Sequence, residues 1–154
     1  MLPEHPVSDF FGFERGTPVD RVYIDDFLTR HADDIRGRVL EVGNDWYTKA
    51  HGGARVTRAD VLHVVAGHAG TTLVGDLANA DTIPAGSFDC LLLTQVLQCI
   101  YDLHAAVRTT HHALKKDGVL LATISGIAQI SLPDHEKWGE YWRITDAAAR
   151  RLFG

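Results

Sequence analysis

The sequence predicts an α/β domain in which a mostly parallel sheet carries helices on both faces. Short apolar runs alternate with helical patterns along the chain, which is the order of βαβ units joined by right-handed crossovers. One run, residues 90–93, is apolar at every position, as expected of a strand that is covered on both faces. The 154 residues are enough for one such domain, and no second domain is expected.

The first regular element is expected to be a helix that follows an irregular arm. Residues 1–17 carry three Phe, two Pro and two Gly without a period. Pro18 can open a helix, so the folded domain is expected to cover residues 18–154. Apolar and aromatic side chains then recur at helical spacing and should pack on the sheet, namely Tyr23, Ile24, Phe27, Leu28 and His31.

Five strands are predicted, at residues 38–42, 54–60, 71–74, 90–93 and 119–124. The fourth is the best candidate for the centre of the sheet. Only residues 44–53 separate the first two strands, so a helix there has two turns at most. Asp102 can cap a helix before the last strand, residues 117–118 form a turn into that strand, and a final helix begins after Thr145.

The composition excludes several classes of protein. Hydrophobic residues at 45% and charged residues at 23% argue against disorder and against a membrane chain. A formal charge of −5 provides no basic field for a phosphate backbone, so nucleic acid is not an expected partner. The first residues lack a basic and an apolar region of the kind found in leader sequences, and no membrane span is expected, so we expect a cytoplasmic protein.

The sequence does not indicate a metal site. Cys90 and Cys99 lie in an apolar stretch at a spacing that matches no zinc pattern, which favours buried, reduced thiols over a disulfide or a metal ligand pair. His111, His112 and the other histidines show no grouping with acids.

Residues 39–43 form the most informative segment. They are typical of a buried strand that ends near an acid, Glu41, and is followed by a sharp turn at Gly43. In α/β proteins such a turn lies at the carboxyl edge of the sheet, where a nucleotide-like cofactor binds. The glycine-rich loop that usually follows is missing, although Asn44 can still adopt a positive φ. Trp46 and Tyr47 either point into the core, the interpretation that we favour, or occupy space that the cofactor would need.

Five segments in the same order resemble those of Rossmann-like (class I) S-adenosylmethionine-dependent methyltransferases of the type 11-like group. They are residues 39–43, 60, 75–77, 83–89 and 114–121, and the resemblance covers residues 37–145. It implies a three-layer Rossmann-like methyltransferase fold with S-adenosyl-L-methionine as the cofactor. It also implies methylation of a small-molecule or sugar-related acceptor, and a catalytically inactive binding or assembly module is the alternative. A nicotinamide dehydrogenase is disfavoured because no Gly-x-Gly-x-x-Gly follows the first strand.

The resemblance also implies a set of cofactor contacts on the first two strands. Gly43, with Asn44 beside it, would let the backbone approach the methionine part, and Glu41 would reach the amino end or order the loop through N–H groups. Asp60, followed by Val61, would accept hydrogen bonds from both ribose hydroxyls. The structural alternatives are a tight turn at Gly43, a partly buried acid at Glu41, and a surface acid or helix cap at Asp60.

Further contacts are implied at the later strands. Asp76 would bind the adenine amine while Leu77 flanks the ring, unless these residues only form a turn. Thr94 and Gln95 would lie where methyl donor and acceptor meet, unless they only begin a helix.

The aromatic segment 134–145 resembles one found in methyltransferase-like proteins of sugar and cell-surface polysaccharide chemistry, with Ile144 in place of the usual Phe. It offers His135 as a general base. The alternative, which we favour, is that its aromatic rings cover the edge of the sheet.

The family normally adds two more strands as an antiparallel pair. Without them, residues 119–124 would form an open apolar edge. Two interpretations stay open: the chain is truncated, or a partner such as a second copy covers this edge.

Overall fold

The protein folds around one five-stranded parallel sheet. The computed structural model describes Ser8 and residues 11–154, so the expectations for the remaining residues of the arm lie outside the described part. The strand order is β3-β2-β1-β4-β5, and every neighbouring pair is parallel. The strands are β1 (Gly37–Val42), β2 (Val56–His63), β3 (Leu73–Val74), β4 (Phe88–Thr94) and β5 (Leu114–Thr123). The parallel α/β class predicted from the sequence is confirmed.

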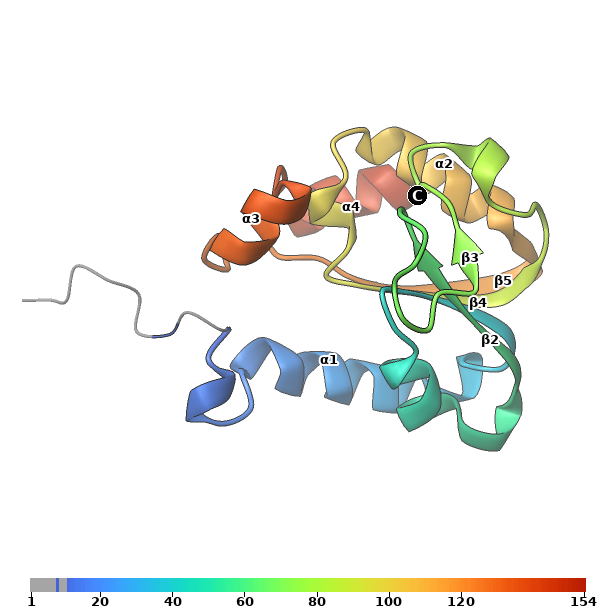
Figure 1. Cartoon of the computed structure of the whole chain (residues 1–154), viewed down its shortest axis with the longest axis horizontal. Coiled ribbons are helices and arrows are strands. Elements are labelled where there is room, and N and C mark those ends of the chain that lie inside the picture. Colours follow the sequence, from blue (N-terminus) through green and yellow to red (C-terminus); the bar gives the residue numbers. More distant parts are fainter. Residues whose placement is uncertain (1–7, 9–10) are drawn as a thin grey trace, which may run out of the picture.

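Helices cover both faces of the sheet. Figure 1 shows α1 (Val19–Arg30) on one face and α2 (Leu103–Ala113) with α4 (Asp146–Phe153) on the other, while α3 (Leu132–Trp138) extends to one side. The side chain of Asp102 accepts a hydrogen bond from the Ala105 N–H at 2.9 Å and caps α2, as predicted. Short helical turns occupy Phe13–Arg15, Ala32–Asp34, Thr48–Gly52, Gly53–Arg55, Ala80–Thr82 and Leu97–Cys99.

The sheet separates two apolar layers because successive side chains of a strand point to opposite faces. On the α2 face, Leu40 of β1 and Leu91 of β4 are fully buried. On the α1 face, Cys90 and Leu92 pack with Leu28 of α1. β4 is thus buried on both faces as predicted, although the middle strand of the five is β1.

The end of β2 and the start of β5 differ most from the prediction. β2 continues through Asp60 to His63, since the Asp60 carboxylate is paired within the sheet. β5 already begins at Leu114, and residues 117–118 form an irregularity within the strand, where Asp117 has a φ of 63°, instead of a turn before it.

The predicted apolar face of α1 is only partly correct. Ile24 and Leu28 are buried and Phe27 is half-buried, but Tyr23 is 71% exposed and His31 is also exposed, so these two do not pack on the sheet. Both cysteines are free, and burial raises the pKa of the Cys90 thiol to about 12 and that of Cys99 to about 11. Among the described residues, no helix could span a membrane and no cluster of His, Cys, Asp and Glu could hold a metal ion.

Candidate functional site

The carboxyl ends of β1, β2 and β4 meet at one edge of the sheet, where an α/β fold binds its ligand. Gly43 follows β1 directly and has a φ of 84°, a conformation that side chains disfavour. Its N–H donates to the Leu62 carbonyl at 3.0 Å, and a Cβ at this position would meet no atom within 4 Å. The backbone at the end of β1 is therefore open to close approach by a ligand.

Glu41 orders the loop after Gly43 from inside the protein. Its side chain is 2% exposed, and Oε2 accepts hydrogen bonds from the Thr48 N–H at 2.8 Å and from the Thr48 hydroxyl at 2.7 Å. Oε1 accepts the Tyr47 N–H at 3.2 Å. Burial raises the pKa of Glu41, although these hydrogen bonds oppose the shift. Two roles were predicted for Glu41, namely contact with the amino end of the cofactor and ordering of the loop. The structure provides contacts for the second role.

The aromatic pair in this loop is divided between core and solvent. Tyr47 packs against the α1-side core, and its hydroxyl accepts a hydrogen bond from Arg21 at 3.3 Å. Trp46 is 74% exposed, so the prediction that both rings point inward is right for Tyr47 and wrong for Trp46. The Asn44 side chain accepts the Trp46 N–H at 3.0 Å and closes the turn without a second glycine.

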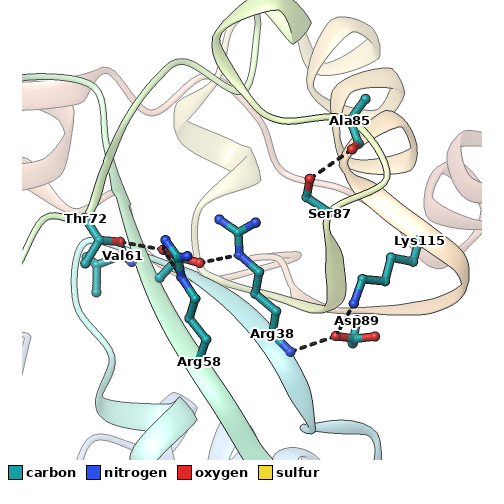
Figure 2. A network of polar contacts seen from close by, with 9 residues as sticks. Arg38, Arg58, Val61, Thr72, Ala85, Ser87, Asp89 and Lys115 are labelled. Atoms are coloured by element: carbon teal, nitrogen blue, oxygen red, sulfur yellow. Dashed lines mark hydrogen bonds and ion pairs between the residues drawn. The ribbon is translucent and has the colours of Figure 1, made fainter.

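Asp60 lies three residues before the end of β2, in a polar network that Figure 2 shows from close by. Its carboxylate accepts hydrogen bonds from Arg38 Nε at 2.6 Å, from Arg58 Nε at 3.2 Å, from the Arg58 terminal nitrogen at 3.0 Å and from the Thr72 hydroxyl at 3.1 Å. Burial acts to raise the pKa of Asp60, but these hydrogen bonds outweigh it and lower the pKa.

The surroundings of Asp60 do not fit the predicted ribose contact. The side chain is 2% exposed, and its four hydrogen bonds use the acceptor capacity of a carboxylate. Val61 is also buried, and its N–H donates to the Thr72 hydroxyl at 2.8 Å. Sequence reasoning missed the two arginines, although Arg58 lies two residues before Asp60 and so on the same face of the strand.

Aromatic and imidazole rings occupy the carboxyl end of β2. His63 is 7% exposed and stacks on His68 with ring centroids 4.2 Å apart. The Val65 N–H donates to His63 Nδ1 at 3.2 Å. The Trp138 ring lies 5.5 Å from the His63 ring in an edge-to-face arrangement. Sequence reasoning missed this cluster because nothing in the local pattern connects Trp138 with β2.

The two residues that were predicted to contact adenine, Asp76 and Leu77, lie in the loop after β3. Asp76 is exposed, and its carboxylate accepts the Ala78 N–H at 2.8 Å. Leu77 is 3% exposed and belongs to the α2-side core. The carboxylate of Asp76 therefore forms a local turn and is still accessible at this end of the sheet, whereas Leu77 is mainly a core residue.

A hydrogen-bonded network joins the carboxyl ends of β4 and β5. Thr94 ends β4, and Gln95 follows with a φ of 58°. Gln95 Oε1 accepts hydrogen bonds from Gln98 Nε2 at 3.0 Å and from the Ser125 hydroxyl at 2.7 Å, and its Nε2 donates to the Thr123 hydroxyl at 3.3 Å. The sequence indicated Thr94 and Gln95, but their partners across the sheet were missed.

Residues 125–144, which we call the crossing segment, run from β5 back over the end of β4. The Tyr141 and Trp142 N–H groups donate to the Gln98 carbonyl at 2.8 and 3.3 Å, and Trp142 Nε1 donates to the Ile100 carbonyl at 3.0 Å. Helix α3 lies inside this segment and carries His135, which is exposed. His135 and Trp138 are three residues apart and so lie on one face of the helix.

A separate groove lies away from this edge. It measures about 1030 Å³ and is formed by α2, β5 and α4, with Leu120, Ala122 and Leu152 among its lining residues. One side of β5 pairs with β4, and no further strand pairs with its other side within the described chain. The apolar open edge expected from the sequence is therefore present.

The comparisons with known proteins agree with this architecture. A sequence profile of the methyltransferase domain family matches residues 40–122, which is more than half of the chain. No curated protein matches the sequence.

Three solved structures illustrate the likeness in fold. The YcgJ protein from Bacillus subtilis has a TM-score of 0.53 at 18% identity, over 66% of this chain and 51% of that one. A SAM-dependent methyltransferase from Archaeoglobus fulgidus has a TM-score of 0.63 at 12% identity, over 93% and 70% of the two chains. The methyltransferase CalH in complex with SAH has a TM-score of 0.58 at 15% identity, over 82% and 46%. The chain thus spans about half the length of YcgJ and of CalH.

Proposed function

Because this chain belongs to the methyltransferase domain family, we propose that it is an S-adenosylmethionine-dependent methyltransferase that acts on a small-molecule or sugar-related acceptor. The observation that carries the proposal is the open glycine turn at Gly43, which is followed by a loop that the buried Glu41 orders. The family membership and the parallel sheet support a cofactor site at this turn. We also propose a cytoplasmic location.

The residues at the edge fit S-adenosylmethionine in part. Gly43 offers open space for the methionine end, with Asn44 beside it, and the exposed carboxylate of Asp76 can accept a hydrogen bond from an adenine amine. S-adenosylmethionine supplies a methyl group on a positively charged sulfur. The protein then has to orient the acceptor and exclude water, a task for the crossing segment and for Thr94 and Gln95.

The acceptor side is proposed to lie among exposed aromatic rings. The Tyr101 ring lies 5.3 Å from that of Tyr141 and 6.2 Å from that of Trp142, and all three side chains are at least 38% exposed. Such flat apolar surfaces suit the ring of a sugar or another small cyclic molecule. His135, exposed on α3, is our candidate for the base that removes a proton from the acceptor hydroxyl.

The test of this function is a transfer assay with the folded chain, S-adenosylmethionine carrying a labelled methyl group, and a panel of sugars and other small alcohols and amines. Label in an acceptor supports the proposal. His135→Gln should lower kcat without weakening cofactor binding. Absence of transfer to every acceptor, together with absence of cofactor binding, contradicts the proposal.

A binding or assembly module without transfer is the second candidate. The altered loop after Gly43 favours it, since Asn44, Trp46 and Tyr47 stand where a flexible glycine-rich loop would usually follow the first strand. The module would use the open edge of β5, where we propose that a second copy pairs with the strand. A stable dimer that binds no S-adenosylhomocysteine would support this candidate.

A further inference from the structure

We propose that Trp138 and His63 form a wall of the subsite that binds the nucleoside end of the cofactor. This inference rests on the proposed function, because it assigns residues to one part of the proposed cofactor site. The sequence led us to expect the carboxylate of Asp60 beside the ribose, whereas this proposal assigns the position to the rings of His63 and Trp138.

The topology places the nucleoside end near His63. In the order β3-β2-β1-β4-β5 the strand connections change direction between β1 and β4, and ligands of open α/β sheets bind outside the carboxyl ends of the strands at such a point. In dinucleotide-binding folds, the residue that contacts the ribose comes about twenty residues after the glycine turn, at the end of the second strand. Counted from Gly43, that position is His63, the last residue of β2.

Asp60 does not supply this contact. It lies three residues deeper in β2, and its carboxylate is already bound by Arg38, Arg58 and Thr72. The residues directly after β2, Val64 and Val65, are exposed and apolar, so neither offers a side-chain acceptor for a ribose hydroxyl.

The two rings offer a different kind of contact. His63 Nδ1 lies 3.2 Å from both the amide nitrogen and the carbonyl oxygen of Val65, so Nε2 is the ring nitrogen that can meet a ribose hydroxyl, a group that both donates and accepts hydrogen bonds. Trp138 meets His63 edge-to-face at 5.5 Å and is still 36% exposed. An indole of this kind can stack on a purine base or cover the sugar.

The crossing segment holds Trp138 in position without a ligand. Its two ends are joined by a hydrogen bond from the Ile144 N–H to the Ser125 carbonyl, and the Tyr141 N–H donates to the Gln98 carbonyl. Inside the segment, Arg143 forms an ion pair with Glu140 at 2.9 Å, and Glu140 also accepts the Ser131 N–H at 2.7 Å. A wall that is ordered in advance loses little conformational entropy when the ligand binds.

The experiment measures calorimetric binding of S-adenosylhomocysteine and of 5′-methylthioadenosine, a nucleoside thioether without the amino-acid part. Trp138→Ala should weaken both ligands by about 5- to 150-fold, the range expected for the loss of one stacked ring. Trp138→Phe keeps an aromatic face and should retain affinity within about threefold. Trp46→Ala is the matched control, since it removes an exposed indole from the loop at the other end of the site and should leave binding of 5′-methylthioadenosine unchanged.

His63→Asn gives an independent measurement. Asparagine can still accept the Val65 N–H but has no ring, so both ligands should again bind more weakly. Circular dichroism and Tm establish that each variant is folded, and Trp138→Leu, which keeps apolar volume without a ring, replaces Trp138→Ala if the alanine variant is unfolded.

The outcomes separate the two proposals. If the wild-type chain binds S-adenosylhomocysteine and the Trp138 variants without a ring bind it equally or more tightly, the inference is overturned while the proposed function stands. A wild-type chain that binds neither ligand contradicts the proposed function itself.

Discussion

The carboxylate of Asp60 lies 2.6 Å from Nε of Arg38, and this ion pair joins β2 to β1 within the sheet. The Arg38 N–H donates to the carboxylate of Asp89 in β4 at 2.7 Å, and Asp89 in turn pairs with Lys115 of β5 at 2.7 Å. Figure 2 shows the backbone nitrogen of Arg38 directed at Asp89 and the Arg38 side chain extending away from that contact. One polar network therefore connects four strands, from the amino ends of β1, β4 and β5 to Asp60 inside β2.

The first prediction concerns the stability that this network provides. Asp60→Ala should lower the free energy of unfolding by about 3–5 kcal/mol, because it leaves the charge of Arg38 without its buried partner. Arg58→Gln is the control and should cost about 1 kcal/mol or less, since the Arg58 side chain is 60% exposed. Urea unfolding measures both values. Equal losses for the two variants would contradict a dominant role for the Asp60–Arg38 pair.

The second prediction concerns stability at low pH. Hydrogen bonds lower the pKa of both Asp60 and Asp89, from Arg38, Arg58 and Thr72 in the first case and from Lys115 and the Arg38 amide in the second. A carboxyl with a lowered folded-state pKa stabilises the protein above its unfolded pKa, and this stability is lost as the pH falls through the folded value.

Tm should therefore fall steeply below about pH 4. In Asp60→Asn, Tm should depend less on pH in that range. Glu41 has a raised pKa and contributes in the opposite direction, favouring the folded state as it becomes protonated. Parallel curves for the wild type and Asp60→Asn would show that Asp60 does not contribute to the acid limb.

The third prediction concerns the loop that Glu41 orders. Thr48→Val removes the hydroxyl that donates to Glu41 Oε2 but keeps the shape of the side chain, so it should cost about 1.5–3 kcal/mol, the range for a hydrogen bond to a charged group. Thr48→Ser keeps the hydroxyl and should cost less. Thermal unfolding of both variants is the measurement, and an equal loss for Ser and Val would show that the hydroxyl is unimportant.

The fourth prediction separates the two aromatic residues after Gly43. Trp46→Ala should change the free energy of unfolding by no more than about 0.5 kcal/mol, because this side chain is mostly exposed. Tyr47→Ala should cost about 2 kcal/mol, less than for a fully buried ring, because Tyr47 is only half-buried in the α1-side core. Chemical denaturation of the two variants side by side tests this, and a larger loss for Trp46→Ala would contradict the observed packing.

The order and type of most elements could be predicted from the sequence. Local patterns carried that information: the apolar run in β4, the cap at Asp102 and the glycine turn at Gly43 are all confirmed. The family resemblance is confirmed as well. The predicted end of β2 was wrong because a charged residue normally ends an apolar run. The ion pair with Arg38 of β1 makes Asp60 compatible with the interior of the sheet.

The candidate site was less predictable because its contacts join segments that are distant in the sequence. Glu41 and Gly43 come from one strand and its turn, so their position could be inferred locally. The pairing of His63 with Trp138 and the bond from Ser125 to Gln95 depend on the path of the crossing segment, for which no periodic pattern exists. The cofactor roles of Asn44, Asp76, Thr94 and Gln95 stay predictions.

The most direct test of the central claim is a calorimetric titration of the folded wild-type chain with S-adenosylhomocysteine. We predict saturable binding of one ligand per chain, with methionine alone binding far more weakly because it lacks the nucleoside. Absence of measurable heat at millimolar S-adenosylhomocysteine, from a chain whose cooperative unfolding shows that it is folded, would contradict the assignment of the carboxyl edge around Gly43 as a cofactor site.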